Sequence, residues 1–145
     1  MIPFSLRIQS GRVQRTMVEL ETRFEVQGRK LLTIGWFEGS GTGRVVLDGP
    51  NDEREEVQVA GLDASLLVEV QEAMSEPPPP VRPGTAAKVH VRLDMDGARV
   101  TRSMEFKGSG TLLDELCVKL LGMAEMMVQG EKLKKIVAAL KARAR

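Results

Sequence analysis

The sequence has few aromatic residues, little net charge and no long apolar run. Tyrosine is absent, and aromatic residues make up 3% of the 145 residues. Proteins that bind RNA or single-stranded DNA stack bases on aromatic side chains, so this composition disfavours nucleic acid as a partner. The net charge of +1 gives no overall basic surface for nucleic acid. No run of 18 apolar residues occurs, and we therefore expect no transmembrane segment.

Cysteine and histidine occur once each, as Cys117 and His90. A single cysteine cannot form an internal disulfide and is typical of a reducing compartment. A zinc site needs several imidazole or thiolate ligands close together, and a catalytic thiol needs an assigned base. We therefore expect no catalytic residue, no metal and no cofactor, and we predict that the protein is not an enzyme. Cys117 is interpreted as a buried apolar side chain and His90 as a surface residue.

Charge is unevenly distributed along the chain. The N-terminal segment has charges and a proline but no apolar stretch, so it does not predict a signal peptide. The segment Glu131–Arg145 contains six basic residues and one acidic residue, a local charge of +5. With the single cysteine, these features predict a cytoplasmic protein.

Apolar and polar residues alternate in two segments, Val18–Val26 and Val89–Met95. A period of two is typical of strands with one buried face. The pairs Gln27-Gly28 and Asp96-Gly97 follow these segments and predict tight hairpin turns. The length fits a single domain, 1–145, in which a return strand completes each hairpin and two further short strands follow the first hairpin.

A proline-rich connector, Ser75–Gly84, separates the two hairpins and contains five prolines. Four consecutive prolines favour an extended polyproline II spacer, and a ligand for a proline-recognition domain is the alternative. Before the connector, the segment Leu66–Met74 predicts a helix for which Asp63 is the candidate N-cap.

A glycine-rich phrase occurs twice, as FEGSGT at Phe37–Thr42 and FKGSGT at Phe106–Thr111. An ungapped alignment places Glu19–Thr42 over Lys88–Thr111, with seven of 24 positions identical. This similarity predicts a duplicated hairpin, with units at 19–42 and 88–111. The phrase offers backbone N–H groups that could hold a phosphate, but it lacks the lysine of a P-loop, and a structural turn is the favoured interpretation.

The C-terminal region, 111–145, predicts a helix in two parts. Apolar residues recur every three or four positions from Leu112 to Val128, after a capping pair, Thr111 and Asp114. Gly130 is expected to interrupt the helix before a second, basic amphipathic part. Methionine-rich faces either fill cores or bind partners. The residues of the predicted partner-binding surface are Met123, Met126, Met127, Lys132, Leu133, Lys134, Lys135, Ile136 and Leu140.

The first glycine-rich phrase, Glu38–Gly43, resembles the [D/N]xSxxG motif of PilZ domains, which are six-stranded barrels that bind cyclic di-GMP. Arg12 and Arg15 resemble the upstream RxxxR motif of that family, although they are one residue closer together and glutamate replaces aspartate. The resemblance implies a barrel. It also implies that Arg12 and Arg15 would hold phosphates and that the ExSxxG residues Glu38, Ser40 and Gly43 would belong to the nucleotide site.

Together these patterns predict an α+β fold: an antiparallel sheet or small barrel with a duplicated hairpin, one internal helix and a two-part C-terminal helix. The predicted function is a non-enzymatic protein-interaction or regulatory module that binds another protein or itself through the C-terminal helices. A degenerate PilZ-like sensor of cyclic di-GMP is the alternative. Binding of nucleic acid or an anionic surface through the basic helix is the third hypothesis.

Overall fold

The computed structural model describes residues 8–9, 12–13, 17–39, 42–61, 64–107 and 110–144, with residues 8–9 and 12–13 described as backbone only. The strands and helices follow one another as β1 (Ile8–Gln9), β2 (Arg12–Val13), β3 (Val18–Val26), β4 (Arg29–Gly39), β5 (Thr42–Asp48), β6 (Arg54–Val59), α1 (Ala64–Ser75), β7 (Ala87–Met95), β8 (Ala98–Glu105), α2 (Leu112–Met127) and α3 (Glu131–Arg143).

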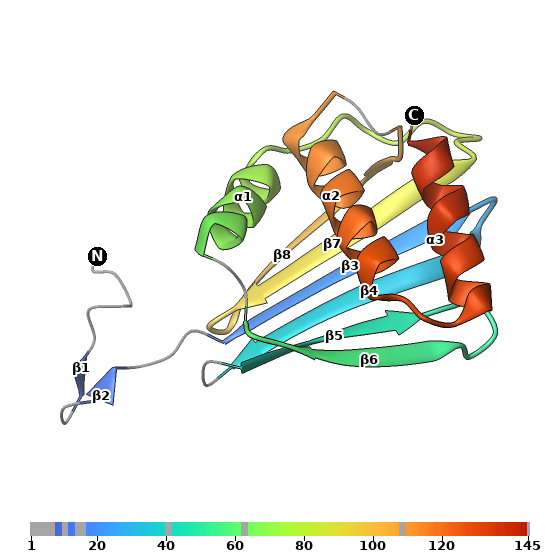
Figure 1. Ribbon diagram of the computed structural model, residues 1–145. Coiled ribbons are helices and arrows are strands. Elements are labelled where there is room, and N and C mark those ends of the chain that lie inside the picture. The colour runs from blue at the N-terminus through green and yellow to red at the C-terminus, as the bar shows by residue number, and fades with distance from the viewer. Residues whose placement is uncertain are drawn as a thin grey trace.

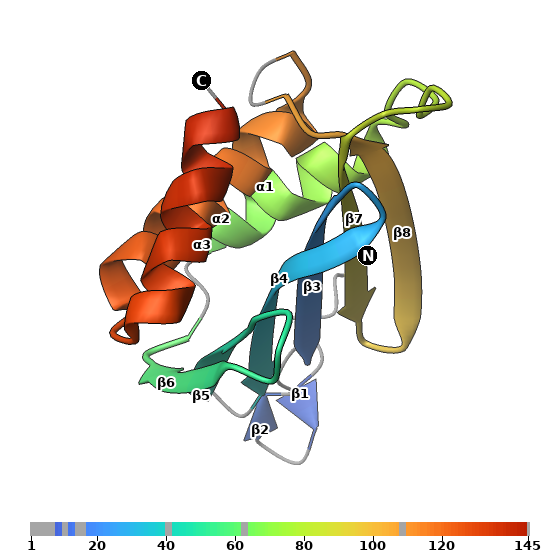
Figure 2. The ribbon, with the colours of Figure 1, turned by 90° about the vertical axis from the view of Figure 1, so that its right-hand side faces the viewer.

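Six of the strands form one antiparallel sheet in the order β6-β5-β4-β3-β7-β8, and β1 and β2 pair separately. The three helices lie in a row, α1-α2-α3, on one face of the sheet, whereas its other face is open (Figures 1 and 2). The α+β fold is therefore confirmed. The sheet is not closed into a barrel, because β6 and β8 stand at opposite ends of the strand order.

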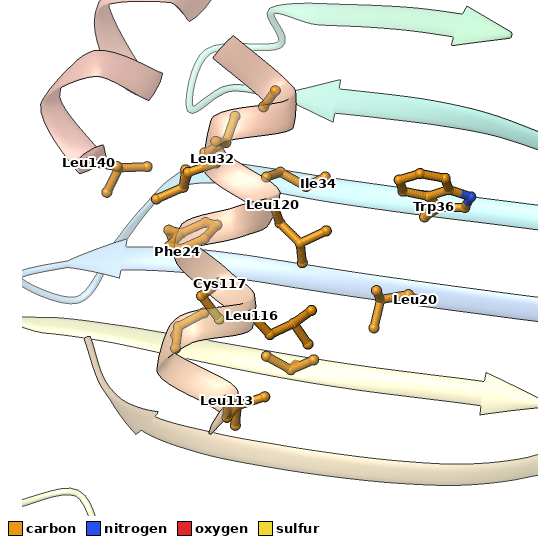
Figure 3. Packing of buried hydrophobic residues seen from close by; sticks show 14 of the residues in the cluster. Leu20, Phe24, Leu32, Ile34, Trp36, Leu113, Leu116, Cys117, Leu120 and Leu140 are labelled. Atoms are coloured by element: carbon orange, nitrogen blue, oxygen red, sulfur yellow. The ribbon is translucent and has the colours of Figure 1, made fainter. Parts of the chain in front are cut away.

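The hydrophobic core lies between the sheet and the helices, as the alternating pattern of the strands requires. The inward face of β3 supplies Leu20 and Phe24, and α2 projects Leu116 and Leu120 toward them (Figure 3). Cys117 is fully buried in the same cluster, which confirms its interpretation as an apolar core residue. No helix in the described part of the chain is long and apolar enough to cross a membrane.

Both predicted hairpin turns are confirmed. Gln27 and Gly28 have φ angles of 52° and 78°, and Asp96 and Gly97 have φ angles of 51° and 89°. Positive φ at both central residues defines a type I′ turn, whose twist matches that of the flanking strands. The pairs Val26–Arg29 and Met95–Ala98 close the two turns in the same way.

The two hairpins meet along β3 and β7. In this antiparallel pairing Thr22 lies opposite Val91, its own counterpart in the sequence alignment. Glu21 lies opposite Arg92, and their counterparts His90 and Arg23 also lie opposite each other. The four consecutive strands β4-β3-β7-β8 thus have a local two-fold relation centred on the Thr22–Val91 pair; the duplication predicted from the alignment remains a prediction.

A β-bulge makes the second strands of the hairpins different. In the first hairpin Phe24 pairs with Leu32, but Glu25 pairs with Lys30, so Leu31 is an extra residue. The pairing of β7 with β8 has no such shift. Since a one-residue slip turns every later side chain to the other face, the aligned phenylalanines point in opposite directions.

Phe106 is buried against Phe24, with ring centres 5.3 Å apart in an edge-to-face arrangement. Phe37 is half-buried on the open face of the sheet, where the guanidinium carbon of Arg44 lies 4.8 Å from its ring centre. The repeated phrase therefore does not place its phenylalanine in the same environment twice.

The predicted break at Gly130 is confirmed and has a contact that explains it. The carboxylate of Glu55, from β6, accepts hydrogen bonds from the backbone N–H groups of Gln129 (2.9 Å) and Gly130 (2.7 Å), just before α3 begins. A Cβ atom on residue 130 would lie only 2.8 Å from the Glu55 Oε2 atom. Glycine at this position lets an acidic side chain satisfy donors at a helix N-terminus.

Candidate functional site

A cavity of about 360 Å³ lies at one end of the sheet. The end of β4, the start of β5, the start of β3 and the β7–β8 turn form its walls. Its lining includes Met17, Glu19, Phe37, Glu38, Gly39, Thr42, Gly43, Arg44, Asp94 and Asp96. Two residues of the predicted ligand site, Glu38 and Gly43, therefore lie side by side at this cavity.

The other predicted ligand residues are not placed by the structure. Arg15 and Ser40 lie outside the described residues, and only the backbone of Arg12 is described, in β2. The structure instead adds residues that the motif did not indicate. Met17 donates its N–H to the Asp96 Oδ1 atom (3.0 Å) and accepts the Asp96 N–H at its carbonyl (3.1 Å), which fixes the β7–β8 turn against the start of β3.

The described lining of the sheet-end cavity is mainly acidic. Glu19, Glu38, Asp94 and Asp96 contribute carboxylates, and Arg44 contributes the only positive charge in the lining. The hydrogen bond from Arg99 Nε (2.7 Å) lowers the pKa of Asp94 below its usual value, so this carboxyl is ionised at neutral pH. An anionic ligand would need positive charge from residues beyond this lining.

The second copy of the phrase caps a helix. The Thr111 hydroxyl oxygen accepts the Asp114 N–H at 3.1 Å at the start of α2, as a capping residue should. In the first copy, the Thr42 hydroxyl donates to the carbonyl of Gly39 at 3.2 Å within a strand connection. The capping prediction for Thr111 is confirmed.

The structure separates the predicted partner-binding residues into three groups. Met126 is 87% exposed, and Lys132, Lys134 and Lys135 are also exposed. Met123, Met127 and Ile136 are half-buried against the core, whereas Leu133 and Leu140 are 2% and 1% exposed and face the sheet. A partner could not contact Leu133 or Leu140 without displacing α3. We use "helical surface" for Met126, Lys132, Lys134 and Lys135.

Charges on the two sides of the molecule are arranged differently. On the open face of the sheet, the single side chain of Arg92 pairs with three acidic residues: Glu19 (3.1 Å), Glu21 (3.8 Å) and Asp94 (3.0 Å). Within the described chain, no ion pair is formed by Lys132, Lys134 or Lys135. These lysines are therefore available to carboxylates of another molecule.

Lys132 has a partial electrostatic partner inside the chain. The backbone N–H of Asn51 holds the pKa of Glu53 below its usual value, and the positive charge of Lys132 adds to this effect. Lys134 and Lys135 are not among the groups that lower the pKa of Glu53. They are consequently the better positions at which to test an interaction with a partner.

The remaining candidates for chemistry do not form a reactive site. Burial raises the pKa of the Cys117 thiol, so the thiolate needed for nucleophilic attack is not formed at neutral pH. His90 lies on the open face of the sheet, with Nδ1 2.7 Å from the Ser103 hydroxyl and Nε2 3.3 Å from Glu25. Among the residues that the structure describes, no cluster of His, Cys, Asp or Glu could hold a metal ion.

Comparison of the sequence with protein-family models and with curated proteins found no match.

Proposed function

We propose that the protein is a non-enzymatic interaction module that binds another protein through the helical surface of α2 and α3. The exposed side chain of Met126 carries this proposal: a flexible apolar residue near the end of α2 is 87% exposed, although the face of α2 beneath it is well packed. Methionine adapts its shape to apolar surfaces and is common at sites that bind proteins.

The charge at the start of α3 indicates the chemistry of the partner. Lys134 and Lys135 follow within one turn of the start of α3 and are exposed. A partner that places an apolar side chain on Met126 and carboxylates near these lysines would complement both features. We infer a cytoplasmic location, because the only cysteine is a buried free thiol.

The test compares three chains: the wild type, Met126→Glu and Met17→Glu. Both methionines are exposed, at 87% and 58%, and they lie on different elements, so Met17→Glu is the matched control. Proteins captured by each immobilised chain are identified by mass spectrometry, and the purified partner is titrated by calorimetry. We expect Met126→Glu to weaken binding at least about tenfold and Met17→Glu to leave it unchanged.

Two further measurements define the mode of binding. Lys134→Glu with Lys135→Glu should weaken binding and reduce its dependence on salt, because screening acts on exposed charges. Sedimentation velocity over a range of concentrations reports whether the partner is a second copy of the chain. If calorimetry gives the same affinity for the wild type and Met126→Glu, the helical surface is not the binding site.

The alternative is a PilZ-like sensor of cyclic di-GMP, and the sheet-end cavity next to Glu38 and Gly43 is the observation that favours it. In this alternative Arg12 and Arg15 add positive charge to that of Arg44 in the described lining. Calorimetric titration with cyclic di-GMP tests it: heat that disappears in Arg12→Ala with Arg15→Ala supports the sensor. Absence of heat at about 1 mM ligand excludes it.

A further inference from the structure

The proline-rich connector between α1 and β7 has a pattern of exposure with a period of three. Pro78 and Val81 are half-buried, whereas Pro77, Pro79, Pro80 and Arg82 are exposed. This period matches the three residues per turn of a polyproline II helix, in which residues 78 and 81 would share one edge. That edge is more covered than the other two.

The connector is held in place at its C-terminal end. The carbonyl oxygen of Arg82 accepts hydrogen bonds from the Thr85 N–H (3.2 Å) and from the Thr85 hydroxyl (2.7 Å). The Arg82 guanidinium also donates to Glu105 on β8 at 3.1 Å. A segment that is already anchored loses less conformational entropy when it binds than a free one.

Open space lies beside the exposed edges. A hollow of about 490 Å³ is lined by Pro77, Pro79, the half-buried Pro78 and Leu112, which is 43% exposed. A second hollow of about 360 Å³ lies between Pro80, Arg82 and the start of α2. The connector leaves α1 and runs along the margin of the molecule before it enters β7, where a partner could approach it (Figure 2). Aromatic side chains of a partner could therefore contact both the prolines and Leu112.

We propose that Pro77–Arg82 is a docking segment for a second protein that has an aromatic-lined groove with carboxylates at one end. Prolines at positions 77 and 80 share one exposed edge and form the P-x-x-P spacing that such grooves bind. Arg82 follows two residues later, and its side chain is 74% exposed. Its ion pair with Glu105 lies at the surface and is therefore weak, so the guanidinium can exchange to a partner's carboxylate.

The groove has to come from another protein. Tyrosine is absent from the sequence, and Trp36, Phe24 and Phe106 are buried in the core. Phe37 is half-buried and its ring is in contact with Arg44. Among the described residues, a second copy of this chain thus offers no aromatic groove. This docking segment is separate from the helical surface and does not depend on it.

The test titrates the full chain into purified SH3, WW and EVH1 domains, three representatives of aromatic-lined grooves that bind polyproline II ligands. Binding is followed by the fluorescence of the tryptophan in each domain's groove. We expect saturable binding to at least one domain. Pro77→Ala with Pro80→Ala should weaken it about tenfold or more, and Pro78→Ala, the matched change on the inner edge, by less than about threefold.

Arg82→Glu keeps every proline and should also weaken binding about tenfold, by placing like charges at the end of the groove. Thermal unfolding of each variant shows whether the fold is intact. No saturation with any of the three domains at about 1 mM would overturn the proposal. Equal losses for Pro78→Ala and the Pro77/Pro80 variant would overturn it as well, because the exposed edge would then have no special role.

Discussion

The two hairpins share a turn geometry and a phrase of sequence, yet their ends have different surroundings. In the first hairpin, β3–β4, the bulge at Leu31 turns Phe37 onto the open face, beside the sheet-end cavity. In the second, β7–β8, the regular register carries Phe106 into the core, and Thr111 then caps α2. One extra residue within a strand thus decides whether the phrase belongs to the core or to the surface.

The largest effect expected from this difference concerns the two phenylalanines. Phe106→Ala removes a buried ring and should lower the free energy of unfolding by about 3–5 kcal/mol. Phe37→Ala removes a half-buried ring and one contact with a guanidinium group, and should cost about 1 kcal/mol. Urea denaturation monitored by circular dichroism measures both. Equal losses would show that the two side chains are not on opposite faces of the sheet.

A smaller effect separates the two threonines that end the phrase. Thr111→Ala removes the acceptor for the Asp114 N–H and should destabilise the protein by about 1 kcal/mol, the usual value of an N-cap. Thr42→Ala removes only a 3.2 Å bond to the Gly39 carbonyl in an exposed connection and should cost less than about 0.5 kcal/mol. Urea unfolding midpoints of the two variants give the comparison. A larger loss for Thr42→Ala would contradict the assignment of the cap.

A stabilising change is expected where the hairpins meet. Thr22 is fully buried, and its hydroxyl has no hydrogen-bond partner in the described structure, whereas its counterpart across the local two-fold is Val91. Thr22→Val keeps the shape and removes the unsatisfied group, so it should raise the free energy of unfolding by about 1 kcal/mol. A calorimetric melting curve checks this value. Destabilisation by Thr22→Val would indicate that the hydroxyl is hydrogen-bonded.

The smallest expected effect is a pH dependence of stability that arises from Asp94 in the second hairpin. The hydrogen bond from Arg99 lowers the pKa of Asp94 in the folded state. Ionised Asp94 therefore stabilises the fold above its unfolded pKa, about 3.9, and this stabilisation is lost as the pH falls through the lower, folded value. Asp94→Asn should accordingly be less stable than the wild type at pH 7, with a difference that shrinks below pH of about 4. Urea unfolding at both pH values measures it, and a constant difference would exclude this linkage.

Local patterns predicted much of this fold because they are set by neighbouring residues. The alternation of Val18–Val26 and the Asp96-Gly97 pair each define a strand or turn without help from the rest of the chain. The bulge was missed, although the adjacent leucines 31 and 32 interrupt the alternation and are a signal of it. Register depends on pairing between strands, and periodicity within one strand cannot determine it.

The candidate sites were less predictable for the same reason. Glu38 and Gly43 were expected from a motif, but Met17 and Asp96 reach the cavity through contacts between distant segments. The apolar pattern of α3 predicted one buried side, yet it could not distinguish a side that binds a partner from one that packs on the sheet. Leu133 and Leu140 pack on the sheet because α3 lies over β4.

The central claim is that the helical surface, and not the end of the first hairpin, binds the partner. The most direct measurement places the photo-reactive residue p-benzoylphenylalanine at position 126 or at position 17 and compares the adducts formed in cells that express the protein. We predict a discrete protein adduct from position 126 that excess wild-type chain competes away, and none from position 17. A competable adduct from position 17 alone, or the same adducts from both positions, would contradict the claim.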